Sequence, residues 1–119
     1  MARLKVYEWE KERWPEFERV VIDKERRAVI LRELAGRFNI PAPGIRQSYR
    51  PGTADGYGGR YSFRTATIRV GVRPRLSTLV HEFAHHLHCC QDGRPVRWHG
   101  KDFKRYLALC YAAGRTYLR

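Results

Sequence analysis

The segment from Leu76 to Cys90 constrains the fold more than any other part of this sequence. Its apolar residues recur at the three- and four-residue intervals that place side chains on one face of an α-helix. Pro74 precedes the segment, and Gly93 follows it in a position that suits a helix C-cap. We therefore predict a helix with one face buried in the core. That face consists of Leu76, Leu79, Val80, Phe83, Ala84, Leu87 and Cys90.

The predicted helix carries the run His81-Glu82-Phe83-Ala84-His85. Four residues advance an α-helix by about 400°, so the two imidazoles leave the same side one turn apart. Their nitrogens can then reach one ion at roughly the 2.0–2.1 Å that zinc prefers. This side lies about 150° from the centre of the apolar face, so we expect it to border a cleft. Glu82 flanks that cleft and can accept a proton from a water that the metal activates.

A catalytic zinc site needs a third protein ligand, because such sites combine three side chains with one water. His86 points about 100° away from His85, and His88 lies about 10 Å along the helix axis from His81. His99 follows a loop after the helix, and a chain that returns across this loop can carry it back to the metal. The sequence therefore favours His81, His85 and His99 as ligands of Zn²⁺.

The remaining patterns predict a small sheet and further helices. Residues 4–9 alternate weakly and suit either a short strand or an irregular arm. The helical pattern from Pro15 to residue 38 fits one helix or two, with Asp23 as a candidate N-cap and a possible break near residues 20–22.

Strands are predicted at residues 45–49, 60–63 and 67–72, with a Gly-rich loop at 50–59. A final helix is expected from about residue 100 to 117. At 119 residues the chain suits a single domain, residues 1–119. We expect an α+β fold in which a small, mainly antiparallel sheet packs on the histidine helix, with other helices flanking it.

Positive charge is concentrated in the part of the chain that carries the histidines. The net charge is +12, and residues 45–119 hold fourteen basic and four acidic side chains, a net of +10. This surplus favours a polyanionic partner, most plausibly nucleic acid, although a solvated basic surface in an Arg-rich protein would look the same.

No stretch of eighteen apolar residues is present, so we expect no membrane-spanning helix. The first residues lack the apolar core of a signal peptide, and we expect the cytosol as the compartment. Cys89, Cys90 and Cys110 form no CxxC pair, and we expect them to be free thiols rather than zinc ligands.

Two motifs together resemble the SprT-like, or Spartan-type, zinc metallopeptidases and their relatives in the WLM group. The first is the HExxH helix at residues 79–85, and the second is the His-Gly-x-x-Phe box within residues 98–103. Residues 58–62 and 67–70 are similar to the strands that precede the metal helix in that family, including the edge strand beside the substrate cleft. The resemblance covers roughly residues 57–107, whereas the first 44 residues match nothing and no C-terminal zinc ribbon precedes Arg119.

The resemblance implies a compact zincin-like domain with His81, His85 and His99 as zinc ligands and Glu82 as general base. It implies a metalloendopeptidase that hydrolyses peptide bonds through a zinc-activated water. Its substrates would be proteins or peptides, and several members of that family act on proteins attached to or near DNA. A substrate strand could pair with the edge at residues 60–63.

Two alternatives remain open on the sequence. One is a basic nucleic-acid-binding module with a non-catalytic zinc site, and the other is a zinc hydrolase that acts on a non-peptide bond. Asp102 either orients His99 or places a negative charge at a helix N-terminus. The candidates for stabilising an oxyanion are Tyr57, Tyr61, His88 and Arg97.

Overall fold

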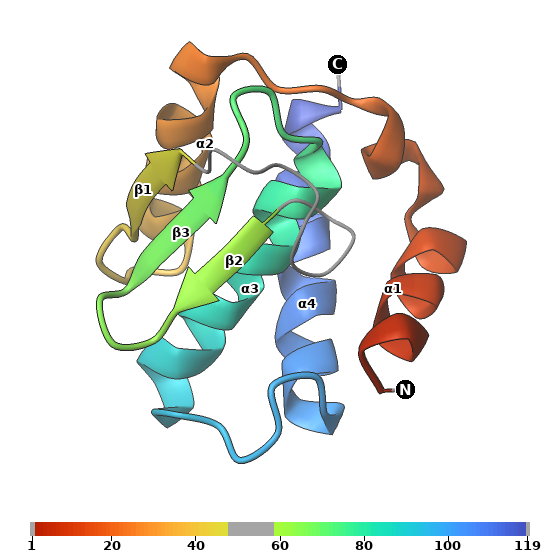
Figure 1. Cartoon of the computed structure of the whole chain (residues 1–119), viewed down its shortest axis with the longest axis vertical. Helices are drawn as coiled ribbons and strands as arrows, with labels where there is room; N and C mark the ends of the chain where they lie inside the picture. Colours follow the sequence, from red (N-terminus) through yellow and green to blue (C-terminus); the bar gives the residue numbers. More distant parts are fainter. Residues whose placement is uncertain (1, 48–58, 119) are drawn as a thin grey trace.

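The predicted histidine helix lies at the centre of the fold in the computed structural model, which describes residues 2–47 and 59–118 (Figure 1). This helix, α3, runs from Leu76 to Asp92. Gly93 follows it with a φ of 78° and donates its N–H to the carbonyl of Cys89. Every residue from Leu76 to Cys89 is buried, so the histidine side of the helix is not a solvent-exposed face. The side that carries the histidines is covered by other elements of the chain.

A three-stranded sheet packs against α3. Its strands are β1 (Gly44–Gln47), β2 (Gly59–Ser62) and β3 (Thr67–Val70), in the order β1-β3-β2. β2 and β3 are antiparallel, but β1 and β3 are parallel, so the sheet is mixed rather than mainly antiparallel. Side-chain alternation predicts that a strand forms but does not encode the direction of its partner. Residues 48 and 49 of the predicted first strand lie outside the described residues.

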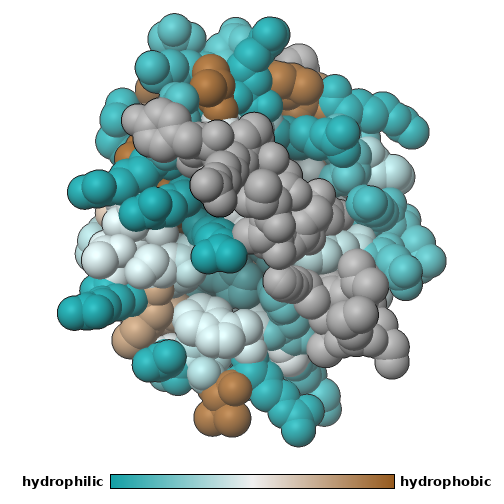
Figure 2. Space-filling view, viewed as in Figure 1, coloured by the Kyte–Doolittle hydropathy of each residue, from teal (hydrophilic) through white to brown (hydrophobic). Residues whose placement is uncertain are grey.

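Two neighbouring rows of residues across the sheet point to opposite faces. The inner row packs toward α3 and consists of Ile45, Ile68 and Tyr61. The outer row is exposed and consists of Arg46, Arg69 and Arg60. Like charges directly opposite each other on one face destabilise a sheet, so folding gains nothing from this arginine row. Figure 2 views the molecule from the sheet side, where much of the coloured surface is hydrophilic.

The N-terminal segment is a helix, α1 (Ala2–Arg13), so the expectation of a strand or arm at residues 4–9 is wrong. Val6, Tyr7 and Glu10 are buried, and their spacing is helical. The helical pattern is hard to recognise in the sequence because one of its buried residues, Glu10, is polar and does not count as hydrophobic. The apolar residues alone then suggest the alternation of a strand.

The open choice between one helix and two is settled in favour of two elements. A 3-10 helix, η1 (Pro15–Arg19), is followed by α2 (Lys24–Arg37), with Asp23 at the N-cap position as predicted. The break occurs where Val21 forms a β-bridge with Arg75. This bridge fixes the chain directly before α3.

The last helix, α4 (Lys101–Gly114), runs beside α3 and ends in a short 3-10 helix, η2 (Arg115–Tyr117) (Figure 1). The structure is therefore an α+β fold with four α-helices and a small mixed sheet in its described part. None of the helices described combines the length and apolar character that crossing a membrane requires.

Candidate metal centre

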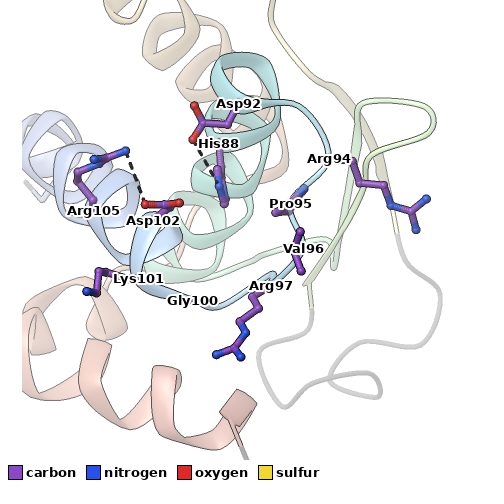
Figure 3. Close-up of a pocket in the computed structure, with 10 residues that line it drawn as sticks. All are labelled: His88, Asp92, Arg94, Pro95, Val96, Arg97, Gly100, Lys101, Asp102 and Arg105. Carbon is purple, nitrogen blue, oxygen red and sulfur yellow. Dashed lines mark ion pairs between the residues drawn. The ribbon is translucent and has the colours of Figure 1, made fainter.

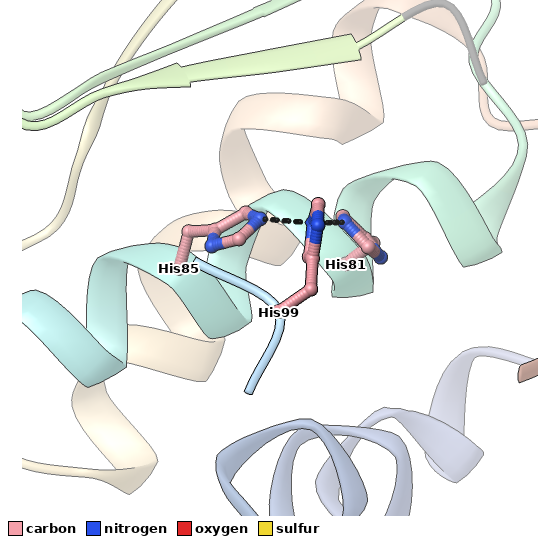
Figure 4. A group of neighbouring side chains, drawn as sticks. All are labelled: His81, His85 and His99. Atoms are coloured by element: carbon pink, nitrogen blue, oxygen red, sulfur yellow. Dashed lines mark hydrogen bonds between the residues drawn. The ribbon is translucent and has the colours of Figure 1, made fainter. Parts of the chain in front are cut away.

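The three histidines that the sequence favours as metal ligands meet at one point. His81 and His85 project from α3 one turn apart, and His99 reaches them from the loop before α4 (Figure 4). Nε2 of His99 lies 3.3 Å from Nε2 of His81 and 3.2 Å from Nε2 of His85. The chain therefore brings His99 to the pair, as expected from the loop that precedes it.

The spacing of these nitrogens fits a zinc ion. Two ligands of a tetrahedral zinc at roughly 2.0–2.1 Å stand about 3.3 Å apart. A ring nitrogen has one lone pair or one N–H, so Nε2 of His99 cannot form two good hydrogen bonds of this length. A single cation can accept the lone pairs of all three nitrogens. The donor set of three imidazoles is also one that catalytic zinc uses.

Helix α1 holds the first of these imidazoles in place. His81 donates its Nδ1–H to Oε2 of Glu10 at 2.6 Å, and both side chains are almost wholly buried. The hydroxyl of Tyr111, on α4, donates to Oε1 of the same carboxylate at 2.7 Å. Because Nδ1 carries the proton that it donates to Glu10, the lone pair of His81 is on Nε2, where a metal would bind.

Sequence reasoning missed Glu10 and Tyr111, as well as Tyr7, whose ring lies 4.9 Å from that of His81. The first 44 residues, which include Tyr7 and Glu10, showed no motif that would have drawn attention to these two side chains. The available signal was Glu10 itself, a carboxylate on the same helical face as Val6 and Tyr7.

Aromatic packing holds the second imidazole. The ring of His85 stacks on Phe103 at 4.2 Å between centroids, and Phe103 also contacts the rings of His81 and His99. This packing gives a role to the phenylalanine of the His-Gly-x-x-Phe box. Burial, together with the neighbouring histidines, lowers the pKa of His85 well below its usual value, so its imidazole is neutral and can offer a lone pair.

Glu82 lies buried beneath the edge strand β2. A Cβ atom at Gly59 would come within 3.1 Å of Oε2 of Glu82 and within 2.8 Å of Cγ2 of Thr78. Only glycine therefore allows β2 to approach α3 this closely. The carboxylate of Glu82 therefore lies directly against the backbone of the edge strand.

The structure separates the candidates for stabilising an oxyanion. Tyr57 lies outside the described residues. The hydroxyl of Tyr61 is 3.0 Å from Nδ1 of His86, and Nε2 of His86 is 2.8 Å from the carbonyl of Pro41. Because the Nε2–H of His86 donates to this carbonyl, the hydroxyl of Tyr61 is the donor to Nδ1. The hydroxyl of Tyr61 is therefore directed toward His86 rather than toward the three metal-ligand candidates.

The other two oxyanion candidates, His88 and Arg97, line a separate pocket. Asp102 is exposed in the first turn of α4 and forms an ion pair with Arg105 at 3.9 Å. This placement favours the helix N-terminal role over the orientation of His99.

The cysteines take no part in the histidine group. All three are free thiols, and Cys90 alone among them is exposed. Burial and the neighbouring Cys90 raise the pKa of Cys89 to about 11, so this side chain is a neutral thiol at physiological pH. The expectation of free thiols is confirmed.

Comparisons of the chain with protein-family models, with curated proteins and with solved structures found no match.

Proposed function

We propose that this chain is a zinc-dependent metallopeptidase with a zincin-like active site of the SprT type. The observation that carries the proposal is the convergence of three imidazoles: Nε2 of His99 lies 3.2–3.3 Å from Nε2 of His81 and of His85. Glu82 is buried on α3, the helix that carries His81 and His85. HExxH helices provide two zinc ligands and a general base in metallopeptidases.

The number of ligands supports a catalytic rather than a structural metal. The group contains three metal-binding side chains among the described residues, and no cysteine belongs to it. Structural zinc sites are normally closed by four protein ligands, often cysteines, whereas catalytic sites leave one position for water or substrate. The three-histidine set is therefore an argument against a purely structural zinc.

Glu82 would move the proton during hydrolysis. A bound zinc supplies Lewis-acid activation of water and of the peptide carbonyl. The carboxylate of Glu82 accepts the proton of the attacking water and delivers it to the leaving amine. Glu10 keeps the ring of His81 in one tautomer throughout, because its hydrogen bond fixes the proton on Nδ1.

The edge strand offers a way to bind an extended peptide. β2 is at the edge of the described sheet, and its Gly59 lies directly against Glu82. A substrate that pairs with this edge through backbone hydrogen bonds would pass close to the general base. Backbone pairing tolerates many side chains, so we propose unfolded protein segments as the substrate class.

Metal dependence tests the proposal. We expect the zinc-loaded protein to cleave a denatured model protein, and we expect a chelator to abolish cleavage until zinc is restored. Gel electrophoresis and mass spectrometry of the products measure the outcome. Cleavage that persists after complete zinc removal would contradict the proposal. Zinc-dependent hydrolysis of an ester without peptide cleavage would favour the non-peptide hydrolase.

The arginine row supports a polyanion as a second partner. Arg46, Arg69 and Arg60 are exposed in register on the sheet face that points away from α3. No ion pair joins any of them to another residue in the ranges 2–47 and 59–118. We propose that this row contacts nucleic-acid phosphates, so that the protein could cleave substrates held near nucleic acid.

Salt dependence separates this contact from the effect of general charge. The association constant K for duplex DNA falls as salt rises, and each phosphate contact steepens this fall. Replacing the three arginines of the row by glutamine should make the negative slope of log K against log salt shallower by about two to three units. The matched control replaces Arg26, Arg32 and Arg37, three exposed arginines of α2, and removes the same charge. Equal slopes for the two triple variants would rule out a dedicated surface on the sheet.

A further inference from the structure

A second group of metal-binding side chains lies where α3 ends and α4 begins. His88 and Asp92 belong to the last turns of α3, and Asp102 belongs to the first turn of α4. One ligand atom from each lies within 4.8 Å of the others. Together they line one wall of a pocket of about 640 Å³ (Figure 3). Neither the catalytic proposal nor the arginine row uses this group.

The buried imidazole of His88 is the feature that points to a ligand. The residue is buried, at 3% exposure, yet Nδ1 has no hydrogen-bond partner among residues 2–47 and 59–118. Nε2 lies 3.7 Å from Oδ2 of Asp92, which is longer than a hydrogen bond. A buried polar nitrogen without a partner is costly. A cation shared by His88 and Asp92 would bind Nε2, the nitrogen that faces the carboxylate at a distance too long for a hydrogen bond. Nδ1 would then carry the proton of the neutral ring.

The two carboxylates are positioned to share such an ion. The hydroxyl of Tyr106, on α4, donates to Oδ2 of Asp92 at 3.0 Å and orients it. Within the described part of the chain, the interaction of Asp102 is an exposed ion pair with Arg105 at 3.9 Å, which is weak.

The basic residues of the same pocket mostly face elsewhere. In Figure 3 the side chains of Arg94, Arg97 and Lys101 extend away from the two carboxylates. The negative groups therefore face the pocket beside the imidazole of His88.

We propose that His88, Asp92 and Asp102 form a second site for a divalent cation. One imidazole nitrogen and two carboxylate oxygens suit zinc or manganese better than calcium or magnesium, which prefer oxygen alone. The ion would connect the end of α3 to the start of α4. It would thereby close the loop of residues 93–100, which carries His99.

Zinc stoichiometry of the metal-free protein tests the proposal. Equilibrium dialysis against zinc should give two ions per chain, one bound more weakly than the other. Asp92→Asn combined with Asp102→Asn should lose the weaker ion and retain the tighter one. Arg105→Gln is the matched control, because it breaks the ion pair of Asp102 without removing a ligand oxygen. This control should still bind two ions.

The possible failures are distinguishable. A wild-type protein that binds one ion, lost in His99→Ala, would overturn the second site and leave the proposed catalytic site intact. Two ions that both persist in the Asp92→Asn, Asp102→Asn variant would also overturn it. Loss of the weaker ion in that variant, with both ions retained by His99→Ala, would support the second site and contradict the ligand set of the proposed catalytic site.

Discussion

Replacing Glu82 by glutamine is expected to lower the rate of peptide hydrolysis by about 10²- to 10⁴-fold without releasing zinc. Glutamine has nearly the same shape and fits the space under Gly59, but its amide cannot accept the proton of the attacking water. The three imidazole nitrogens are unchanged, so metal affinity should remain. The loss should therefore appear in kcat rather than in zinc content.

A fluorogenic peptide assay, with zinc measured on the same samples, checks this result. Glu25→Gln is a suitable control, because it makes the same chemical change at an exposed position on α2. It should behave as the wild type. If Glu82→Gln and the wild type cleaved at equal rates, Glu82 would not be the general base. A variant that lost zinc together with activity would instead show that Glu82 supports the metal.

Zinc affinity should follow a defined order among three variants. His99→Ala removes a ligand and should weaken tight zinc binding by more than 100-fold. Glu10→Gln keeps all three nitrogens but loses the carboxylate that orients His81, so a loss of about 10- to 100-fold is expected. His88→Ala should leave the tight site unchanged, because His88 is outside the histidine group.

Competition with a chromophoric chelator measures these affinities, and circular dichroism verifies that each variant is folded. Tight zinc binding that survived in His99→Ala and disappeared in His88→Ala would reverse the ligand assignment. An unchanged affinity in Glu10→Gln would mean that the buried hydrogen bond serves only the packing of α1.

The parts of the site that could be predicted are those encoded by local spacing. His81 and His85 share a helix side because they are four residues apart, and the loop before His99 allows its return. Glu10 could not be found in this way, because it precedes His81 by 71 residues in the sequence. The two side chains meet only when α1 packs beside α3. The burial of the histidine side of α3 could not be predicted for the same reason, since helical periodicity does not reveal which elements will cover a polar face.

The hydrogen bonds of Glu10 also bear on when the proposed metal centre can form during synthesis. Tyr111, which donates a hydrogen bond to the second oxygen of the Glu10 carboxylate, is 101 residues further along the chain. During translation, His81, His85 and His99 are all made before the helix that carries this tyrosine. A nascent chain can therefore contain every proposed zinc ligand before it can hold His81 in its final orientation. The vectorial order of synthesis thus places full assembly of the proposed site after the synthesis of α4.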